Sequence, residues 1–295
     1  MALWGRSLPP VPSSFLRYTL WLPSVRVDRL RTDRLGRHPT PLRMAPAYNL
    51  LPQANWDFYF CTLDGQPASI MLDLALRATA PQAERPHLLQ IDVRINDPNA
   101  FGLTGSAEAE TFFILEDRLA DHLAHNLDAL YVARITSSGY RRFYFYARAA
   151  VDMDRIVEEV MERFVRHHYT ATAREDAAWE VYLHTCYPAP AQYQAMLNRR
   201  VLDHLAASGD NLSQAREVSH FLSFPDKGAR SRFLTALTGE GFEVQKSTDD
   251  ALRLVLIREE RIDPTAIDGL TQRIMALAEG VGGSYDGWET AMVRG

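Results

Sequence analysis

Apolar, aromatic and β-branched residues form short runs in the first half of the chain, which is typical of strands. Two of these runs, 56–63 and 68–76, flank Asp64-Gly65, a dipeptide that favours a tight hairpin turn. A third run covers 87–95. The pattern therefore predicts a hairpin followed by one more strand.

Two later segments have a helical period instead. Residues 107–124 are predicted to form a helix. A second helix is predicted to begin after Asp152, a good N-cap residue, and to bury an apolar stripe that recurs at i, i+3, i+4, i+7, i+8 and i+11. The first helix buries Phe112, Leu115, Leu119 and Leu123, and the second buries Met153, Ile156, Val157, Val160, Met161 and Phe164.

Between these helices, 130–136 and 142–147 are predicted to pair as a hairpin across Ser137-Ser138-Gly139. The segment 178–187 is predicted to be a strand that closes the unit before two prolines. From residue 87 onward the order is then strand, helix, strand, strand, helix, strand.

The same order returns after a linking helix that ends at Gly209. It comprises a strand at 216–224, a helix capped by Asp226, strands at 241–247 and 251–257, a helix and a strand at 284–293. Asp263-Pro264 opens the last helix, and Thr248-Asp249-Asp250 is the turn between the two middle strands. The expected apolar faces are Tyr193, Leu197, Val201 and Leu205; Phe233, Leu234 and Leu237; and Ile267, Leu270, Ile274 and Leu277.

Two successive βαββαβ units predict an α+β protein with two ferredoxin-like sandwiches in tandem, the first with an additional N-terminal β-hairpin. The predicted domains are 44–188 and 189–295. Residues 1–43 are expected to be a disordered or misannotated extension, because prolines interrupt every apolar run. Two alternatives are a transit peptide and a true start at Met44.

Charge is distributed unevenly along the chain. The net charge is −5, but residues 1–43 carry eight Arg and two Asp, which leaves −11 on the remainder. A fold that acidic repels phosphate backbones, so we expect no direct nucleic-acid binding and instead a basic protein partner. No apolar run approaches the ~20 residues that span a bilayer, so no membrane contact is expected.

The residues with chemical potential form no catalytic or metal-binding set. Cys61 and Cys186 are expected to be reduced core thiols, which favours a cytoplasmic location. His122 and His125 have a metal-compatible spacing without a third ligand, and no cofactor motif is found. We therefore predict no catalytic residues, no metal and no cofactor.

Other polar residues have structural interpretations. His167-His168 are expected to cap a helix end or face solvent, and Glu116-Asp117-Arg118 to form a solvated helix face. His220 alternates with two apolar residues, which predicts a buried, hydrogen-bonded histidine, with a proton shuttle as the alternative.

The C-terminal third contains Arg216-x-Val218-x-His220, Gly241-Phe242 and Tyr285-Asp286-Gly287-Trp288. With these motifs it resembles the RraB family, whose members regulate RNase E. The most distinctive element is the ending Tyr285-Asp286-Gly287-Trp288 after a helix and a glycine. Asp286 is expected to cap backbone amides in a bulge and Trp288 to enter the core, with an interface role as the alternative. The family motif comprises Arg216, Val218, His220, Gly241, Phe242, Tyr285, Asp286, Gly287 and Trp288.

This resemblance implies binding to the basic, largely disordered scaffold region of an RNase E-like endoribonuclease, with inhibition through protein–protein contact. The region 55–187 is similar to a domain of unknown function often found fused ahead of RraB-like domains. The carboxylates expected to meet the partner are Asp249, Asp250, Glu259 and Glu260. The alternatives are an enzyme with a small-molecule site between the domains and a non-catalytic assembly module.

Overall fold

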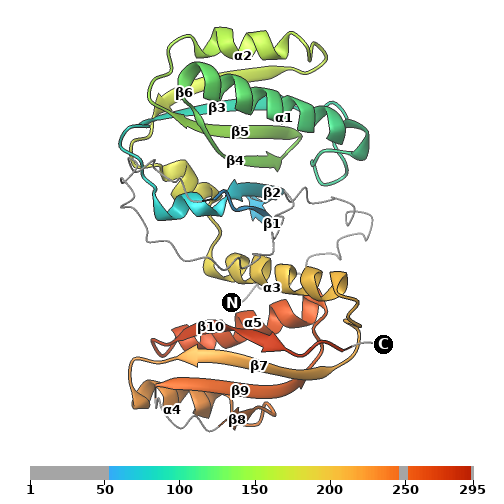
Figure 1. Cartoon of the computed structure of the whole chain (residues 1–295), viewed down its shortest axis with the longest axis vertical. Coiled ribbons are helices and arrows are strands. Elements are labelled where there is room, and N and C mark those ends of the chain that lie inside the picture. Colours follow the sequence, from blue (N-terminus) through green and yellow to red (C-terminus); the bar gives the residue numbers. More distant parts are fainter. Residues whose placement is uncertain (1–52, 246–251, 294–295) are drawn as a thin grey trace, which may run out of the picture. The chain divides into compact units, whose positions relative to one another are not determined.

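A computed structural model describes residues 53–245 and 252–293 (Figure 1). These residues form one antiparallel sheet of six strands and another of four. The predicted extension 1–43 and the predicted turn Thr248-Asp249-Asp250 lie outside the described residues. Within the described ranges, no helix is long and apolar enough to cross a membrane.

The first sheet has the strand order β1-β2-β4-β5-β3-β6. Its part β4-β5-β3-β6, with α1 and α2 in the connections, is ferredoxin-like, and the predicted hairpin β1–β2 extends it beside β4. The elements are β1 (Trp56–Leu63), β2 (Gln66–Asp73), β3 (His87–Arg94), α1 (Ser106–Leu127), β4 (Leu130–Ser137), β5 (Tyr140–Ala147), α2 (Met153–Met161) and β6 (Tyr169–Glu175).

Both predicted hairpins of this half are confirmed, and the turn residues explain them. Asp64 and Gly65 have φ angles of 49° and 77°, and Ser138 and Gly139 have 54° and 77°. Positive φ at both central positions gives the turn whose twist matches that of paired strands. Glycine at the second position adopts this conformation without a steric cost.

The strand predicted at 178–187 is wrong. The closing strand is β6, and this later segment contains a π-helical turn, η3 (Val181–Cys186). Trp179, Tyr182 and Cys186 are all fully buried. Their spacing of three and four residues is a helical one, so the period itself argued against a strand.

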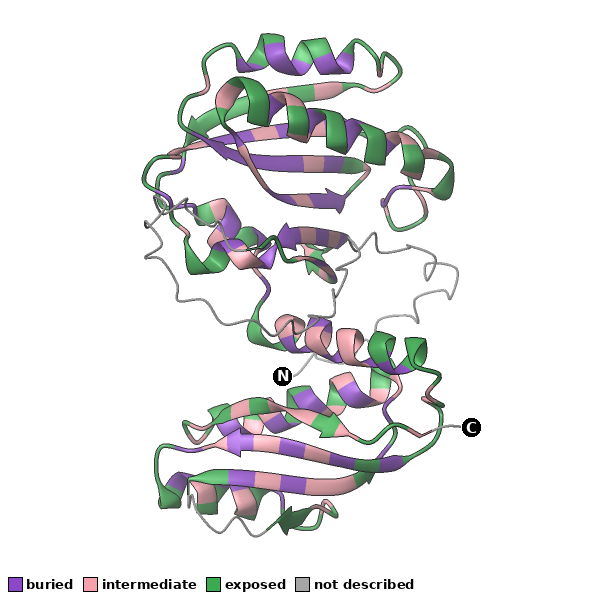
Figure 2. Cartoon of the chain, viewed as in Figure 1, coloured by how far each residue is buried: buried purple, intermediate pink, exposed green. Residues whose placement is uncertain are grey.

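The first sheet is covered on both faces by described residues. Helices α1 and α2 bury their apolar stripes against one face (Figure 2). Phe112 and Val157 of these stripes are fully buried. The opposite face is packed by η3 and by a short 3-10 helix, η2 (Leu74–Ala78). The predicted face of α1 is thereby confirmed, and so is that of α2 up to Met161, where the helix ends before Phe164.

Asp152 does not cap α2 as predicted. Its φ is 60°, and its side chain makes no capping hydrogen bond. A capping residue normally has an extended backbone conformation, and the left-handed backbone of Asp152 does not meet this requirement. Asp226 and Asp263 are extended and accept the backbone N–H of Ala229 and Ala266 as predicted.

The second sheet has the strand order β10-β7-β9-β8, which is also ferredoxin-like. The predicted α+β class and tandem ferredoxin-like plan are therefore confirmed. The elements of this part are α3 (Pro190–Ala207), β7 (Arg216–Ser223), α4 (Lys227–Ala236), β8 (Glu243–Gln245), β9 (Arg253–Glu260), α5 (Pro264–Glu279) and β10 (Ser284–Thr290).

All three helices of this part pack on one face of the four-stranded sheet. Phe233 of α4 and Ile274 of α5 share a core with Leu222 and Leu256, and Leu202 of α3 packs against Val218. The face predicted for the linking helix is only partly correct: Leu205 is buried, but Tyr193, Leu197 and Val201 are half-buried. The other buried positions are Gln194, Met196, Asn198 and Leu202.

Candidate partner-binding surface

The four-stranded sheet presents a second face on which none of the described helices packs. Strand β7 alternates strictly: Val218, His220 and Leu222 are buried under the helices, so Glu217 and Ser219 point to the other side. We call this side the open face. By strand register its residues are Glu217, Ser219, Phe221 and Ser223 of β7, Arg253, Val255, Ile257 and Glu259 of β9, Glu243 and Gln245 of β8, and Ser284, Gly287 and Glu289 of β10.

Four carboxylates form an acidic band across this face, one from each strand. Glu217 on β7 lies directly opposite Glu259 on β9. Glu289 on β10 pairs with Ser219, which is two residues from Glu217 and on the same face of β7. Glu243 pairs with Ile257, beside Glu259. All four are exposed, and none of them is in an ion pair with another described residue. Like charges directly opposite each other destabilise a sheet, so the fold alone does not account for the band.

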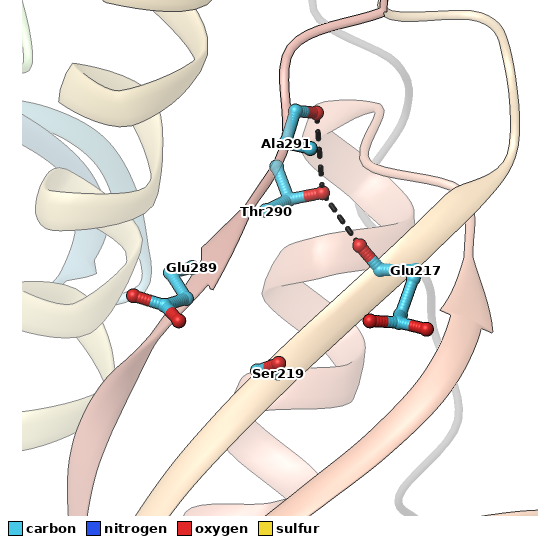
Figure 3. A pocket seen from close by; sticks show the side chains of 5 residues that line it. All are labelled: Glu217, Ser219, Glu289, Thr290 and Ala291. Atoms are coloured by element: carbon cyan, nitrogen blue, oxygen red, sulfur yellow. Dashed lines mark hydrogen bonds between the residues drawn. The ribbon is translucent and has the colours of Figure 1, made fainter.

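A pocket of about 280 Å³ lies at one end of the band, between β7 and β10 (Figure 3). It is lined by Glu217, Ser219, Glu289, Thr290 and Ala291. The Thr290 hydroxyl donates to the backbone oxygen of Glu217 at 2.6 Å and so connects the two strands. This hydrogen bond does not involve the carboxylate of Glu217 or of Glu289. Two carboxylates and two hydroxyls make a lining that is rich in acceptors.

An apolar row continues from the pocket along the open face. Phe221 lies opposite Val255, and Ile257 follows on the same side of β9. All three are half-buried. On the other flank of Phe221 stands Gly287, where a Cβ atom would meet nothing within 4 Å. The face therefore combines an acidic end with an accessible apolar centre.

The inner face carries most of the motif residues found in the sequence. His220 is fully buried, and a 2.8 Å hydrogen bond joins its Nδ1 to the Tyr285 hydroxyl. Burial, and then the Arg258 charge, lowers the pKa of His220 from 6.5 to about 4. The predicted buried, hydrogen-bonded histidine is confirmed. Phe242 packs edge-on against the same ring.

The distinctive C-terminal tetrapeptide also has a structural role. Trp288 packs beside Val218, and its indole N–H donates to the side-chain oxygen of Asn198 at 2.8 Å. Asp286 lies in a β-bulge, as predicted, but it accepts from the hydroxyls of Ser223 and Ser284 and not from backbone amides. The motif therefore connects the strands and α3 inside the domain.

Two further motif residues, Arg216 and Gly241, also have structural roles. Arg216 is buried and donates to Asp210 at 2.7 and 2.8 Å. Asp210 also accepts the backbone N–H of Val293, and these hydrogen bonds hold its pKa below the usual range, with the bond from Arg216 as the largest cause. Gly241 has a φ of 76°, which suits the turn into β8.

Two family models match the chain, one in each domain. Residues 195–290 match the family model RraB, described as Regulator of ribonuclease activity B. Because of this match, we call the C-terminal domain the RraB-family domain. Residues 54–187 match DUF695, a family of unknown function. No curated protein matches the chain.

Among solved structures, the chain is similar to one titled "Crystal structure of putative glycine cleavage system transcriptional repressor". The identity is 10%, the similarity covers 70% of this chain and 98% of that one, and the TM-score is 0.18. The fold assignment of the RraB-family domain rests on its strand order and connections.

The carboxylates predicted to meet a partner fall into three groups. Asp249 and Asp250 lie outside the described residues. Glu259 is exposed in the acidic band of the RraB-family domain. Glu260 was predicted to be exposed, but it is buried and accepts from Arg258 at 2.6 Å. The alternation of β9 explains the difference, because adjacent residues face opposite sides.

Sequence reasoning missed the carboxylates of β7, β8 and β10. Glu217, Glu243 and Glu289 are far apart in sequence, and only strand pairing brings them together. One local signal was present: Glu217 precedes Val218 in an alternating strand, which places it on the face opposite His220.

The other candidate residues belong to the packing of the first domain. Glu116 was predicted to lie on a solvated face, but it is buried, accepts the Tyr131 hydroxyl at 2.9 Å and pairs with Arg134. It follows Phe112 by one helical turn and so shares its inward face. Burial, and then the neighbouring Glu116 charge, raises the pKa of Asp117.

The histidines and cysteines have similar structural settings. His167 was expected to cap or face solvent; its ring is 6% exposed and lies 3.2 Å from the backbone oxygen of Arg94. The Nε2 atom of His122 lies 3.8 Å from the carboxylate oxygen Oε2 of Glu159. Cys186 is buried, which raises its pKa to about 12, and Cys61 is half-buried. Within the described ranges, no group of three or more potential ligands could hold a metal ion.

Proposed function

We propose that this protein is a regulator that binds an RNase E-like endoribonuclease and lowers its cleavage of RNA through protein–protein contact. The observation that carries the proposal is the match of residues 195–290 to the family described as Regulator of ribonuclease activity B. In this role the protein is not an enzyme and acts in the cytoplasm.

The charge of the chain supports a basic protein region as the point of contact. The whole chain has a net charge of −5, and the part after residue 43 has −11. Such a surface attracts a cationic disordered segment and repels RNA, so the regulator would act on the nuclease and not on its substrate. The match of residues 54–187 to a family of unknown function adds no activity.

The test is an RNA-cleavage assay with purified RNase E and a short fluorogenic RNA, titrated with the full-length protein. We expect the cleavage rate to fall and then level off as the protein saturates the nuclease. A truncated nuclease that lacks its scaffold region should cleave at the same rate with or without the protein. An unchanged rate for the complete nuclease at ~100 μM protein would reject the proposed function, because that concentration detects even very weak binding.

A further inference from the structure

We infer that the open face of the RraB-family domain is the docking surface for an extended protein segment that carries arginine, and that the pocket between β7 and β10 holds one guanidinium group. This inference takes the kind of partner, a basic protein region, from the proposed function. It adds the surface, the recognised side chain and the spacing that the partner must have.

The open face is a sheet face on which no described element packs. In the first domain both sheet faces are packed by described residues, whereas the described helices of the RraB-family domain all pack on the inner face. Phe221, Val255 and Ile257 nevertheless form an apolar row on the other side. A partner that covers this row would remove it from water.

The charge of the open face is complementary to that of a cationic segment. The register places four carboxylates in the band and one cation, Arg253, on the same face in the described residues. Arg253 pairs with Ser223, at the opposite end of β9 from Glu259, so the band itself contains no described basic residue. A cationic segment would relieve the repulsion between Glu217 and Glu259 on binding.

The pocket selects arginine over lysine by its chemistry. Its lining offers the carboxylates of Glu217 and Glu289 and the hydroxyl of Ser219, all as acceptors around a space of about 280 Å³. A guanidinium group is planar and presents five N–H donors in a fixed fork, so it can bond to several of these groups at once. An ammonium group is a more strongly hydrated point charge and matches such a set less well.

The separation of the pocket from the apolar row sets the spacing in the partner. Glu217 and Phe221 are four residues apart on β7, which is roughly 13 Å at about 3.3 Å per residue. Side chains four positions apart in an extended segment point the same way and have the same separation. The partner should therefore carry an arginine and an apolar residue at positions i and i+4.

The test uses the full-length protein and fluorescein-labelled Gly-Ser peptides that contain one arginine and one leucine. The two residues are placed four positions apart in the first peptide and three positions apart in the second. A third peptide carries citrulline in place of arginine, which keeps the shape and removes the charge. We expect the first peptide to bind at least ten-fold more tightly than either of the others.

The protein variants are E217Q/E289Q and, as a matched control, E110Q/E279Q. Both pairs remove two exposed carboxylates, but the control positions lie on helices α1 and α5 and not on the strands of the open face. We expect E217Q/E289Q to weaken binding of the first peptide at least ten-fold and the control to change it less than two-fold. Equal losses in the two variants, or no loss in E217Q/E289Q, would overturn the inference.

The same variants separate this inference from the proposed function. If the wild-type protein leaves RNase E cleavage unchanged while the peptides behave as expected, the docking surface stands and the proposed function fails. If the wild-type protein and E217Q/E289Q inhibit RNase E equally, the proposed function stands and the docking surface is rejected. Circular dichroism and thermal melts establish that each variant is folded.

Discussion

At the scale of single residues, His220 makes folding stability depend on pH. Its pKa is lowered from 6.5 to about 4 by burial and by the Arg258 charge, so the unfolded chain takes up the proton first as the pH falls. The stability that neutral His220 contributes is therefore fully present above pH 6.5 and is lost as the pH falls through about 4. The loss is on the order of 3 kcal/mol.

Urea denaturation at pH 7 and pH 4.5 measures this effect. The wild type should lose more unfolding free energy between the two pH values than His220→Gln does, by about 2 kcal/mol. The variant is expected to be less stable at pH 7, because it lacks the hydrogen bond between the His220 ring and the Tyr285 hydroxyl. Equal losses in both proteins would show that His220 does not titrate in this range.

Two aspartates at helix starts should respond differently to substitution. Asp263→Ala removes a side chain that accepts the Ala266 N–H, so it should lower the free energy of unfolding by about 1 kcal/mol. Asp152→Gly removes no capping bond and relaxes a residue with a φ of 60°, so stability should stay the same or rise slightly. Thermal melts of both variants check this, and a clear loss in Asp152→Gly would contradict it.

At the scale of elements, α1 is attached to its sheet by a buried carboxylate as well as by apolar contacts. Glu116→Ala leaves Arg134 and the Tyr131 hydroxyl without their acceptor, so it should destabilise the protein by about 3 kcal/mol. Glu110→Ala, on the exposed side of the same helix, should change stability by less than about 0.5 kcal/mol. Similar urea midpoints for the two variants would contradict the buried role.

The open face should be more stable without its charges. Glu259→Gln removes a carboxylate that lies directly opposite Glu217, so the free energy of unfolding should rise by roughly 0.2 to 1 kcal/mol at low salt. The gain should disappear at high salt, because screening already weakens the repulsion in the wild type. A loss of stability in low-salt thermal melts would indicate that Glu259 supports the sheet and not a partner.

At the scale of the whole molecule, the acidic charge should make association sensitive to salt. Binding to the RNase E scaffold region, followed by titration calorimetry, should weaken roughly ten-fold or more between 50 and 300 mM salt, since the Debye length is only ~10 Å at 0.1 M. The variant E217Q/E289Q should show a smaller dependence. An affinity that does not change with salt would rule out the charge-complementary contact.

The order of elements could be predicted from local patterns because each pattern reports its own segment. The apolar stripe that begins at Met153 predicted α2, and the turn dipeptide Asp64-Gly65 predicted the first hairpin. The prediction was wrong where two periods compete in a short aromatic segment, as in 178–187. It was also wrong at Asp152, where backbone conformation and not residue type decides whether a side chain caps.

The sequence by itself determined the elements of the two βαββαβ units other than β6, the buried His220 and the inner core of the RraB-family domain. These follow from periodicity and from motif residues within single elements. Tertiary structure alone decided which carboxylates come together. Glu217, Glu259 and Glu289 become neighbours through the strand order β10-β7-β9, and Glu260 is buried because its strand alternates. Non-local pairing sets these positions, and no local period encodes it.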